Sequence, residues 1–340
     1  MRCLPQRVRA KSKGSMPSSD PKISVLIPLK RLNDYVRESL EHLAQQTYTN
    51  FDVYVVTDDP EVCDVPARLD VKFRASGAVP PNIKRMNAAR ESDAAIVALL
   101  DDDAFPVPEW LQAAARHFED PTILAVGGPG ITPPHDSSSQ QASGAVYASP
   151  LVSAGYVYRY LPATSRDVDD YPSCNLIVRR EPFLKYVPEC VRYWPGEDTK
   201  LCMLLTRGER GRILYDPAVA VYHHRRKLFW GHFRQVWNYA VHRGFFAKRY
   251  PDTSLRPQYF IPSLFVLGNI AALVLVFADR VRIAALVAAA AYALCVILAA
   301  AAVKRTHTAS PPLVALGIYL THLTYGTGFM IGLLRPELDH

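Results

Sequence analysis

The sequence predicts an α/β domain with a mostly parallel sheet, followed by an amphipathic helix and three membrane-spanning helices. Up to about residue 225, short apolar runs alternate with segments of helical spacing, a pattern typical of a parallel sheet covered on both faces. After Gln258 charged residues become rare, and three apolar segments follow one another. Each has about 20 residues, enough to cross the hydrocarbon core of a bilayer.

The first hundred residues contain the clearest elements. Ile23–Leu29 is an apolar run rich in β-branched residues, which predicts a buried first strand. Asn33–Gln46 has helical spacing and begins with Asn33, a residue type that commonly caps helices. The same patterns predict further strands and a polar helix, at Phe51–Val56, Asp70–Phe73 and Ala94–Leu100 for the strands and Asn82–Ser92 for the helix.

The second half of this region is less regular. Residues 127–172 are rich in Gly, Pro and Ser, which predicts a long irregular loop that is functional or mobile. We expect order to return at Tyr171–Val178, and Glu197–Thr206 predicts a helix between two glycines. Tyr215–Tyr222 predicts a strand that ends in two histidines.

The charge distribution points to a membrane surface. The net charge is +7, and much of the excess lies over residues 225–256, directly before the apolar region. Basic residues there fit an anionic cytoplasmic leaflet better than a nucleic acid, so we expect no nucleic-acid partner. Within this stretch, Leu228–Phe246 mixes aromatic and basic residues and predicts an amphipathic helix lying on the membrane.

These patterns divide the chain into four parts. Residues 1–22 are basic and polar without an apolar core, which predicts a disordered tail and not a signal peptide. The six cysteines show no CxxC pair and no zinc spacing, which favours reduced thiols in a reducing compartment. The other predicted parts are an α/β domain over 23–225, an interfacial helix and linker over 226–256, and a transmembrane region over 257–335 with spans at 259–278, 283–303 and 313–334 and charged turns at 279–282 and 304–312.

The strongest functional signal is a run of three acidic residues, Asp101–Asp103, directly after a predicted buried strand. Carboxylates gathered there repel one another, and no basic neighbour is evident from the sequence. A hard divalent cation relieves the repulsion and completes its shell with water and substrate phosphates. Asp58 follows a second strand, and ligands of such sheets bind at the carboxyl ends of the strands. The sequence therefore predicts an Mn²⁺ or Mg²⁺ site.

Two other nucleotide-binding classes are excluded. A dinucleotide-binding domain needs GxGxxG immediately after its first strand, so that the backbone can approach a pyrophosphate. This chain has Lys30-Arg31-Leu32-Asn33 there, with no glycine. A P-loop is also absent from the sequence.

From Ile23 to about Gly244 the chain resembles the family 2 glycosyltransferases, inverting enzymes with the GT-A fold. The motifs that carry the resemblance are ISVLIPLKR, VVTDDP, PNIKRMNAARESDAAIVALLDDDAFPVPEWL, PSCNLIVRRE, PGEDTKLC and YDPAVAVYHHRR. The resemblance implies a metal-dependent enzyme of cell-envelope polysaccharide synthesis that moves one sugar from a UDP-, GDP- or dTDP-sugar to a lipid-linked or cell-surface glycan. It would be a multi-pass protein of the inner (cytoplasmic) membrane with its catalytic domain in the cytosol.

The resemblance also implies which residues bind the donor. Asp58 would accept a hydrogen bond from the nucleotide base, and Lys84 and Arg85 would face the diphosphate. Asp101 would lie near the ribose and the metal, with Asp103 as the principal metal ligand. The middle residue of the acidic run has no assigned role.

On the acceptor side, Asp198 falls where the family keeps its general base. Inverting transfer needs a carboxylate there to take the proton of the attacking hydroxyl, and the first turn of a helix keeps that carboxylate ionised. The alternative interpretation for Glu197 and Asp198 is a simple negative charge at the N-terminus of a helix. Glu197, Asn175 and Trp194 are expected beside it on the acceptor side.

The end of the motif series leaves two questions open. The resemblance implies that a histidine after the last strand helps to hold the metal or the diphosphate, and His223 is expected in that role. For His223 and His224 alike, solvation at the interface is the alternative, and which of the two binds the metal is open. The helix HFRQVWNYAVHRGFF lacks the Arg-Trp pair of the QxxRW motif found in processive synthases, which favours single transfer over polymer synthesis. A catalytically inactive membrane-associated binding module is the alternative from another class; it would have lost the acidic run or Asp198, and both are present.

Overall fold

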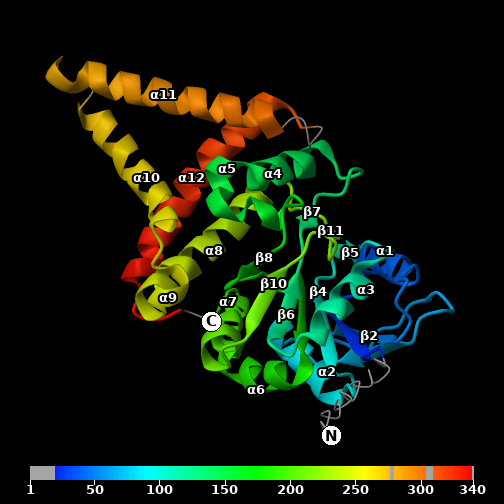
Figure 1. The fold of residues 1–340 in the computed structure, drawn as a ribbon. Coiled ribbons are helices and arrows are strands. Elements are labelled where there is room, and N and C mark those ends of the chain that lie inside the picture. The colour runs from blue at the N-terminus through cyan, green and yellow to red at the C-terminus, as the bar shows by residue number, and fades with distance from the viewer. Residues whose placement is uncertain (1–19, 276–278, 304–308, 339–340) are drawn as a thin grey trace, which may run out of the picture.

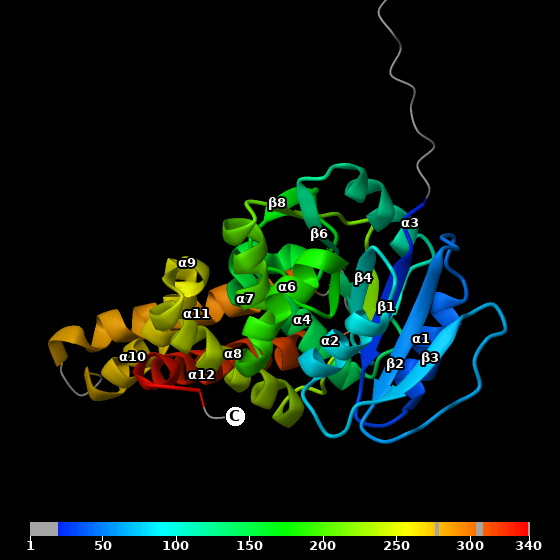
Figure 2. The ribbon, with the colours of Figure 1, turned by 90° about the horizontal axis from the view of Figure 1, so that it is seen from below.

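The computed structural model describes residues 20–275, 279–303 and 309–338. Its centre is an eight-stranded sheet with helices on both faces (Figures 1 and 2). The strands of this sheet are β1 (Ile23–Pro28), β2 (Phe51–Thr57), β3 (Val71–Ala75), β4 (Ile96–Leu100), β6 (Ile123–Gly127), β8 (Arg166–Val168), β9 (Asn175–Arg179) and β10 (Arg212–Tyr215). Their order is β3-β2-β1-β4-β9-β6-β10-β8, and only β8 and β9 run antiparallel to their neighbours. The predicted fold class is confirmed.

A second, three-stranded sheet lies beside the first. It consists of β5 (Ala104–Pro106), β11 (Val221–His223) and β7 (Gly130–Ile131), with β11 in the middle. β11 is antiparallel to β5, so that His223 lies opposite Ala104. This pairing joins the segment after the acidic run to a segment more than a hundred residues further along the chain.

Helices cover both faces of the large sheet because its strands are apolar on both sides. Successive side chains of a strand point to opposite faces. Accordingly, Val25 lies in one buried cluster with α1 (Asp34–Leu43) and α3 (Trp110–Ala115). Leu26 lies in the other, with α2 (Pro81–Glu91) and α6 (Arg180–Cys190). The predicted cap of the first helix is confirmed, since Asn33 Oδ1 accepts a hydrogen bond from Val36 N at 2.9 Å.

Two predictions for the middle of the chain are wrong. Residues 127–172 are not one irregular loop, because they contain the buried helix α4 (Ser138–Ala148) and the short helix α5 (Pro150–Ser153). Small residues let α4 be buried nearly all round, so it has no apolar stripe for sequence analysis to detect. Residues 215–222 do not form one strand, because Tyr215 is the last residue of β10 and Val221 is the first of β11, which belongs to the other sheet.

The C-terminal part is helical. It comprises α8 (Trp230–Arg249), α9 (Pro251–Ser254), α10 (Pro257–Leu275), α11 (Asp279–Val303) and α12 (Pro311–Leu334). Three stretches, Pro257–Val274, Arg282–Ala302 and Pro311–Leu334, are long and apolar enough to cross a membrane. α10 and the N-terminal part of α11 extend away from the sheet domain, and the C-terminal part of α11 returns to pack against α4 (Figure 1). α12 lies along α8.

The structure tests only part of the predicted boundaries here. The charged turn predicted at 279–282 is wrong, because α11 begins at Asp279. Most of the predicted tail, the last residues of the first predicted span and part of the turn predicted at 304–312 lie outside the described residues. The five cysteines within the described ranges are free.

Glycines allow α8 and α12 to approach closely. A Cβ added to Gly332 would lie 2.0 Å from the carbonyl oxygen of Val241, and one added to Gly244 would lie 2.1 Å from that of Phe329. Both distances are far below van der Waals contact with backbone atoms, which cannot move aside as a flexible side chain can. The two helices can therefore pack this closely only because Gly332 and Gly244 have no side chains.

We predict that Gly332→Ala destabilises the protein, by about 1–3 kcal/mol as is usual for overpacking. The matched control is Gly268→Ala on α10, where an added Cβ meets nothing within 4 Å. Alanine is the better helix former, so the control should be neutral or slightly stabilising. Thermal unfolding of the two detergent-solubilised variants measures this, and equal melting temperatures would contradict the proposed packing.

Candidate active site

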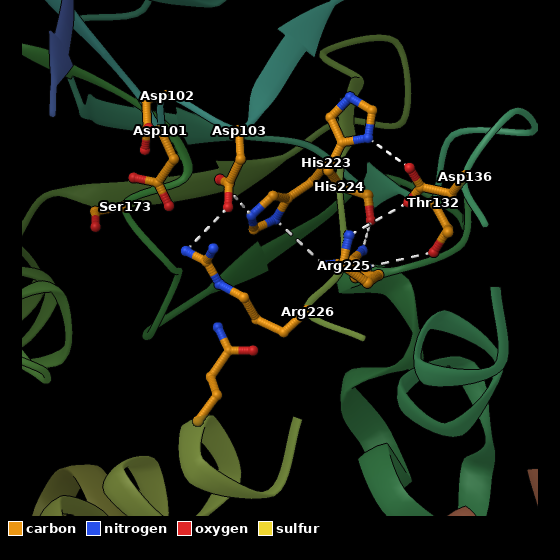
Figure 3. A network of polar contacts seen from close by, with 12 residues as sticks. Asp101, Asp102, Asp103, Thr132, Asp136, Ser173, His223, His224, Arg225 and Arg226 are labelled. Atoms are coloured by element: carbon orange, nitrogen blue, oxygen red, sulfur yellow. Dashed lines mark hydrogen bonds and ion pairs between the residues drawn. The ribbon is translucent and has the colours of Figure 1, made fainter. Parts of the chain in front are cut away.

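The acidic run lies where the two sheets meet. β4 ends at Leu100, and the pairing of β5 with β11 brings His223 beside Asp103, with His223 Nε2 3.1 Å from Asp103 Oδ1. One ligand atom each of Asp101, Asp103 and His223 lie within 4.8 Å of one another (Figure 3). Two carboxylates and one imidazole at this spacing fit a divalent cation, and a bound cation would take the place of the proton that His223 and Asp103 share.

The protonation of this cluster follows from its charges. Burial would raise the pKa of Asp103, but His223 and Arg226 outweigh it and lower the pKa to about 2. Burial would likewise lower the pKa of His223, but the Asp103 carboxylate raises it to about 10. Asp102 differs from its neighbours, because burial and the adjacent Asp103 raise its pKa to about 6. Its Oδ2 accepts from Asn33 Nδ2 at 2.6 Å, so the middle residue ties the acidic run to the cap of α1.

The expectation that the acidic run has no basic neighbour is wrong. Arg85 forms an ion pair with Asp101 and donates from Nη1 to Ser173 Oγ at 3.0 Å, and its side chain is buried. Arg226 Nη2 lies 3.2 Å from Asp103 Oδ2, although 58% of its side chain is exposed. Sequence reasoning placed Arg226 in the membrane-facing basic stretch, because nothing in the sequence shows that β11 turns it back towards the carboxylates.

The resemblance implies that Lys84 faces the diphosphate of the donor, but its side chain is buried and bonded inside the protein. Its side chain is 2% exposed, its Nζ donates to Leu29 O at 2.5 Å, and it forms an ion pair with Asp58. Lys84 therefore connects the segments that follow β1 and β2. Asp58 itself is partly exposed at the end of β2, where the sequence places it.

Asp198 lies in the first turn of α7 (Glu197–Met203), as predicted. Its two oxygens accept from Ser173 N at 3.2 Å and Thr199 N at 2.7 Å, which fixes the orientation of the carboxylate. Burial, and then the nearby charge of Asp170, raises its pKa above the ordinary value of 3.8. A raised pKa makes Asp198 a stronger base than an exposed aspartate.

The remaining acceptor-side predictions fare differently. Glu197 faces a small pocket beside Arg85, and burial together with Asp198 raises its pKa to about 7. Trp194 is half-exposed, two residues before Gly196. Asn175 is completely buried; it donates to Gly128 O and Val219 O, both at 2.7 Å, and accepts from Trp110 Nε1 at 2.9 Å. The acceptor-side prediction for Asn175 is wrong, because its hydrogen-bonding groups are all used inside the core.

A cavity of about 240 Å³ extends from Asp198 to the C-terminal helices. Asp198, Cys174 and His223 line it at the sheet. Its other end is formed by Pro262 of α10 and by α12. About half of the other lining residues are aromatic or basic, among them Tyr147, Arg159, Arg225, Tyr239, Arg243 and Tyr259, and α12 contributes Thr321, His322 and Tyr325.

A buried charge cluster forms one wall of this cavity. Asp170 Oδ2 lies 3.4 Å from Arg159 Nη2 and 3.1 Å from Arg243 Nη1, while its Oδ1 accepts from Thr199 Oγ1 at 3.0 Å. Burial would raise the pKa of Asp170, but the two arginines lower it to about 2. Sequence reasoning missed Asp170 and Arg159, which lie in the stretch predicted to be a loop, and it assigned Arg243 to the membrane surface.

Comparison with known proteins agrees with this geometry. Residues 24–187 match the model of glycosyl transferase family 2. Over these residues, a little under half of the chain, the sequence is similar to the family 2 glycosyltransferases. EpsH of Bacillus subtilis (strain 168), a protein named as a glycosyltransferase, is 26% identical over 116 residues, which are 31% of this chain and 33% of that relative. The matched part thus spans about a third of the relative's own length.

A solved structure extends the comparison to the fold. It is the mannosyltransferase PcManGT from Pyrobaculum calidifontis in complex with GDP-Man and Mn²⁺, which is 20% identical with a TM-score of 0.51. The likeness covers 93% of this chain and 87% of that one, and at this identity it concerns the fold alone. In this chain, the acidic run lies inside the part that matches the family, whereas Asp198, His223 and most of the cavity lie beyond it.

Proposed function

We propose that this protein is a metal-dependent, inverting glycosyltransferase that moves one sugar from a nucleoside diphosphate sugar to an acceptor presented at a membrane. The observation that carries the proposal is the cavity, which joins Asp198 and His223 to helices long and apolar enough to cross a bilayer. A donor bound at the acidic strand end and an acceptor entering from those helices would meet beside Asp198.

On the donor side, Asp101, Asp103 and His223 would hold Mn²⁺ or Mg²⁺. When bound, the ion neutralises charge that develops on the leaving diphosphate. Arg226 is exposed and reaches Asp103, so it can move to a phosphate oxygen while Arg85 stays fixed in its ion pair with Asp101. Asp58, at the next strand end, would accept a hydrogen bond from the base. The Mn²⁺ and GDP-Man of the mannosyltransferase with a similar fold support this assignment.

On the acceptor side, Asp198 would take the proton of the attacking hydroxyl as its oxygen bonds to C1 of the sugar. The bond from C1 to the diphosphate breaks on the opposite face, which inverts the configuration at C1. Ser173 N and Thr199 N already orient the carboxylate, so little reorganisation is needed. Asp198 must be ionised to act, so transfer should fall as the pH drops through its raised pKa.

The acceptor would be lipid-linked or held at the membrane, with the catalytic domain on the cytosolic side of the inner membrane, where nucleotide sugars are made. Aromatic rings along the cavity suit the apolar faces of sugars, and the arginines suit phosphate or sugar hydroxyls. Absence of the QxxRW motif favours a single transfer over processive synthesis.

We predict that transfer requires a divalent cation and the Asp103 carboxylate. Asp103→Asn removes a charged ligand, so metal-dependent binding of the donor should be lost and turnover should fall about 100-fold or more. The control is Asp59→Asn, which removes an exposed carboxylate from the same edge of the sheet and should leave turnover unchanged. The assay is release of nucleoside diphosphate from UDP-, GDP- and dTDP-sugars with Mn²⁺ or with EDTA. Undiminished release in excess EDTA would refute the metal requirement.

We predict that Asp198→Asn separates chemistry from donor binding. The substitution keeps the volume but removes the proton acceptor, so the single-turnover rate should fall about 10²–10⁴-fold. Donor Kd, measured by calorimetry, should stay within a few-fold of wild type, because the donor binds at other residues. Glu197→Gln is the matched control and should retain most of the rate. Wild-type transfer by Asp198→Asn would show that Asp198 is only a helix-terminal charge.

A further inference from the structure

The two histidines after β11 face different surroundings. His223 points to Asp103, whereas His224 points away from the acidic run towards Asp136 (Figure 3). This is the alternation expected of successive residues on a strand. His224 is almost completely buried, and neither donor binding nor proton transfer uses it.

His224 lies in a second group of residues able to hold a metal ion. Its Nε2 is 2.9 Å from Glu38 Oε2 of α1, and His135 Nε2 is 3.2 Å from Glu38 Oε1. One ligand atom from each of the three residues lies within 4.8 Å of the other two. Around a tetrahedral zinc ion with bonds of 2.0–2.1 Å, neighbouring ligand atoms are about 3.3 Å apart. The two distances to the Glu38 carboxylate are close to this value, and the ligand atoms of the three residues all lie within 4.8 Å of one another.

The surroundings of His224 are those of a metal ligand. Its Nδ1 is hydrogen-bonded to the buried carboxylate of Asp136, which fixes the ring and leaves Nε2 to face Glu38 and His135. Metal-binding histidines are commonly oriented by a carboxylate in this way. Tyr35 stacks on the ring at 4.4 Å between centroids, and this shields one side of the group from solvent.

We propose that Glu38, His135 and His224 form a zinc site separate from the acidic strand end. Two imidazoles and one carboxylate favour zinc, whereas the carboxylate-rich acidic run favours Mn²⁺ or Mg²⁺. A water molecule completes the coordination, since His135 leaves the site open on one side. The ion joins α1, the loop after β7 and the end of β11, and it thereby fixes the strand that carries His223.

The test uses the full chain, purified in detergent, stripped with chelator and titrated with ZnCl₂ in the absence of nucleotide. Wild type should retain one zinc ion per chain after desalting, and zinc should raise its melting temperature. Bound Co²⁺ should give the strong visible absorption of a four-coordinate site. His135→Asn removes a half-exposed ligand without disturbing the core, and it should weaken zinc binding at least tenfold and abolish the thermal shift.

Two controls make the outcome decisive. His117→Asn removes another histidine beside a carboxylate, with His117 Nε2 2.6 Å from Asp216 Oδ2. This variant should bind zinc as wild type does. Asp103→Asn should also keep the zinc. The proposal is overturned if wild type retains no zinc, or if zinc is lost with Asp103→Asn but kept with His135→Asn, which would place the ion at the acidic strand end.

Discussion

The antiparallel pairing of β11 with β5 is the constraint on which the rest of the site depends. It sets His223 opposite Ala104, and the backbone N–H of His224 donates to Asp103 O at 2.9 Å. Without this pairing, the acidic run would be a carboxylate-rich turn at the end of β4 with no imidazole and no Arg226. With this pairing, β11 places His223 beside Asp103 on one side and directs His224 towards Glu38 and His135 on the other.

The need to pair buried charges also determines the structure of the cavity wall next to Asp198. Asp170 and its two arginines connect the segment before β9 to α8, and removing one partner of such a group typically costs about 3–5 kcal/mol. Because Asp170 also accepts from Thr199, the same cluster fixes the first turn of α7, where Asp198 lies. The close packing of α8 on α12 then brings the apolar helices to this wall. Asp198, the cavity and the helices of membrane-spanning length are thus one connected arrangement.

Periodicity and strand-end chemistry predicted the parts of the fold with strong local signals. β1, α1 with its Asn33 cap, β2 and β4 lie within a few residues of their predicted ranges, and the carboxylates Asp101 and Asp103 fall at the expected strand end. α4 could not be predicted, because its own small residues let it be buried nearly all round. Its sequence therefore has no separate apolar and polar faces. The division between β10 and β11 was missed for a similar reason: a change of sheet leaves no local trace.

The features of the site that the sequence does not predict depend on contacts between residues that lie far apart in the chain. The sequence shows that Lys84, Arg85 and Arg226 lie near the functional motifs, but only the fold shows which carboxylate each of them pairs with. Asn175 has a polar side chain near a family motif, and only its contacts with Gly128, Val219 and Trp110 show that it belongs to the core. Local sequence patterns therefore predict which residue types a site contains, whereas the role of each residue depends on its tertiary contacts.

The fate of the transferred sugar tests most directly whether the cavity delivers an acceptor from the membrane. The full chain would be reconstituted in nanodiscs with a lipid-linked acceptor and given radiolabelled nucleotide sugars with Mn²⁺. Label should pass into the organic phase with the lipid, and water-soluble glycans added in its place should be poor acceptors. Equal transfer to soluble glycans, or label released only as free sugar, would contradict a membrane-presented acceptor.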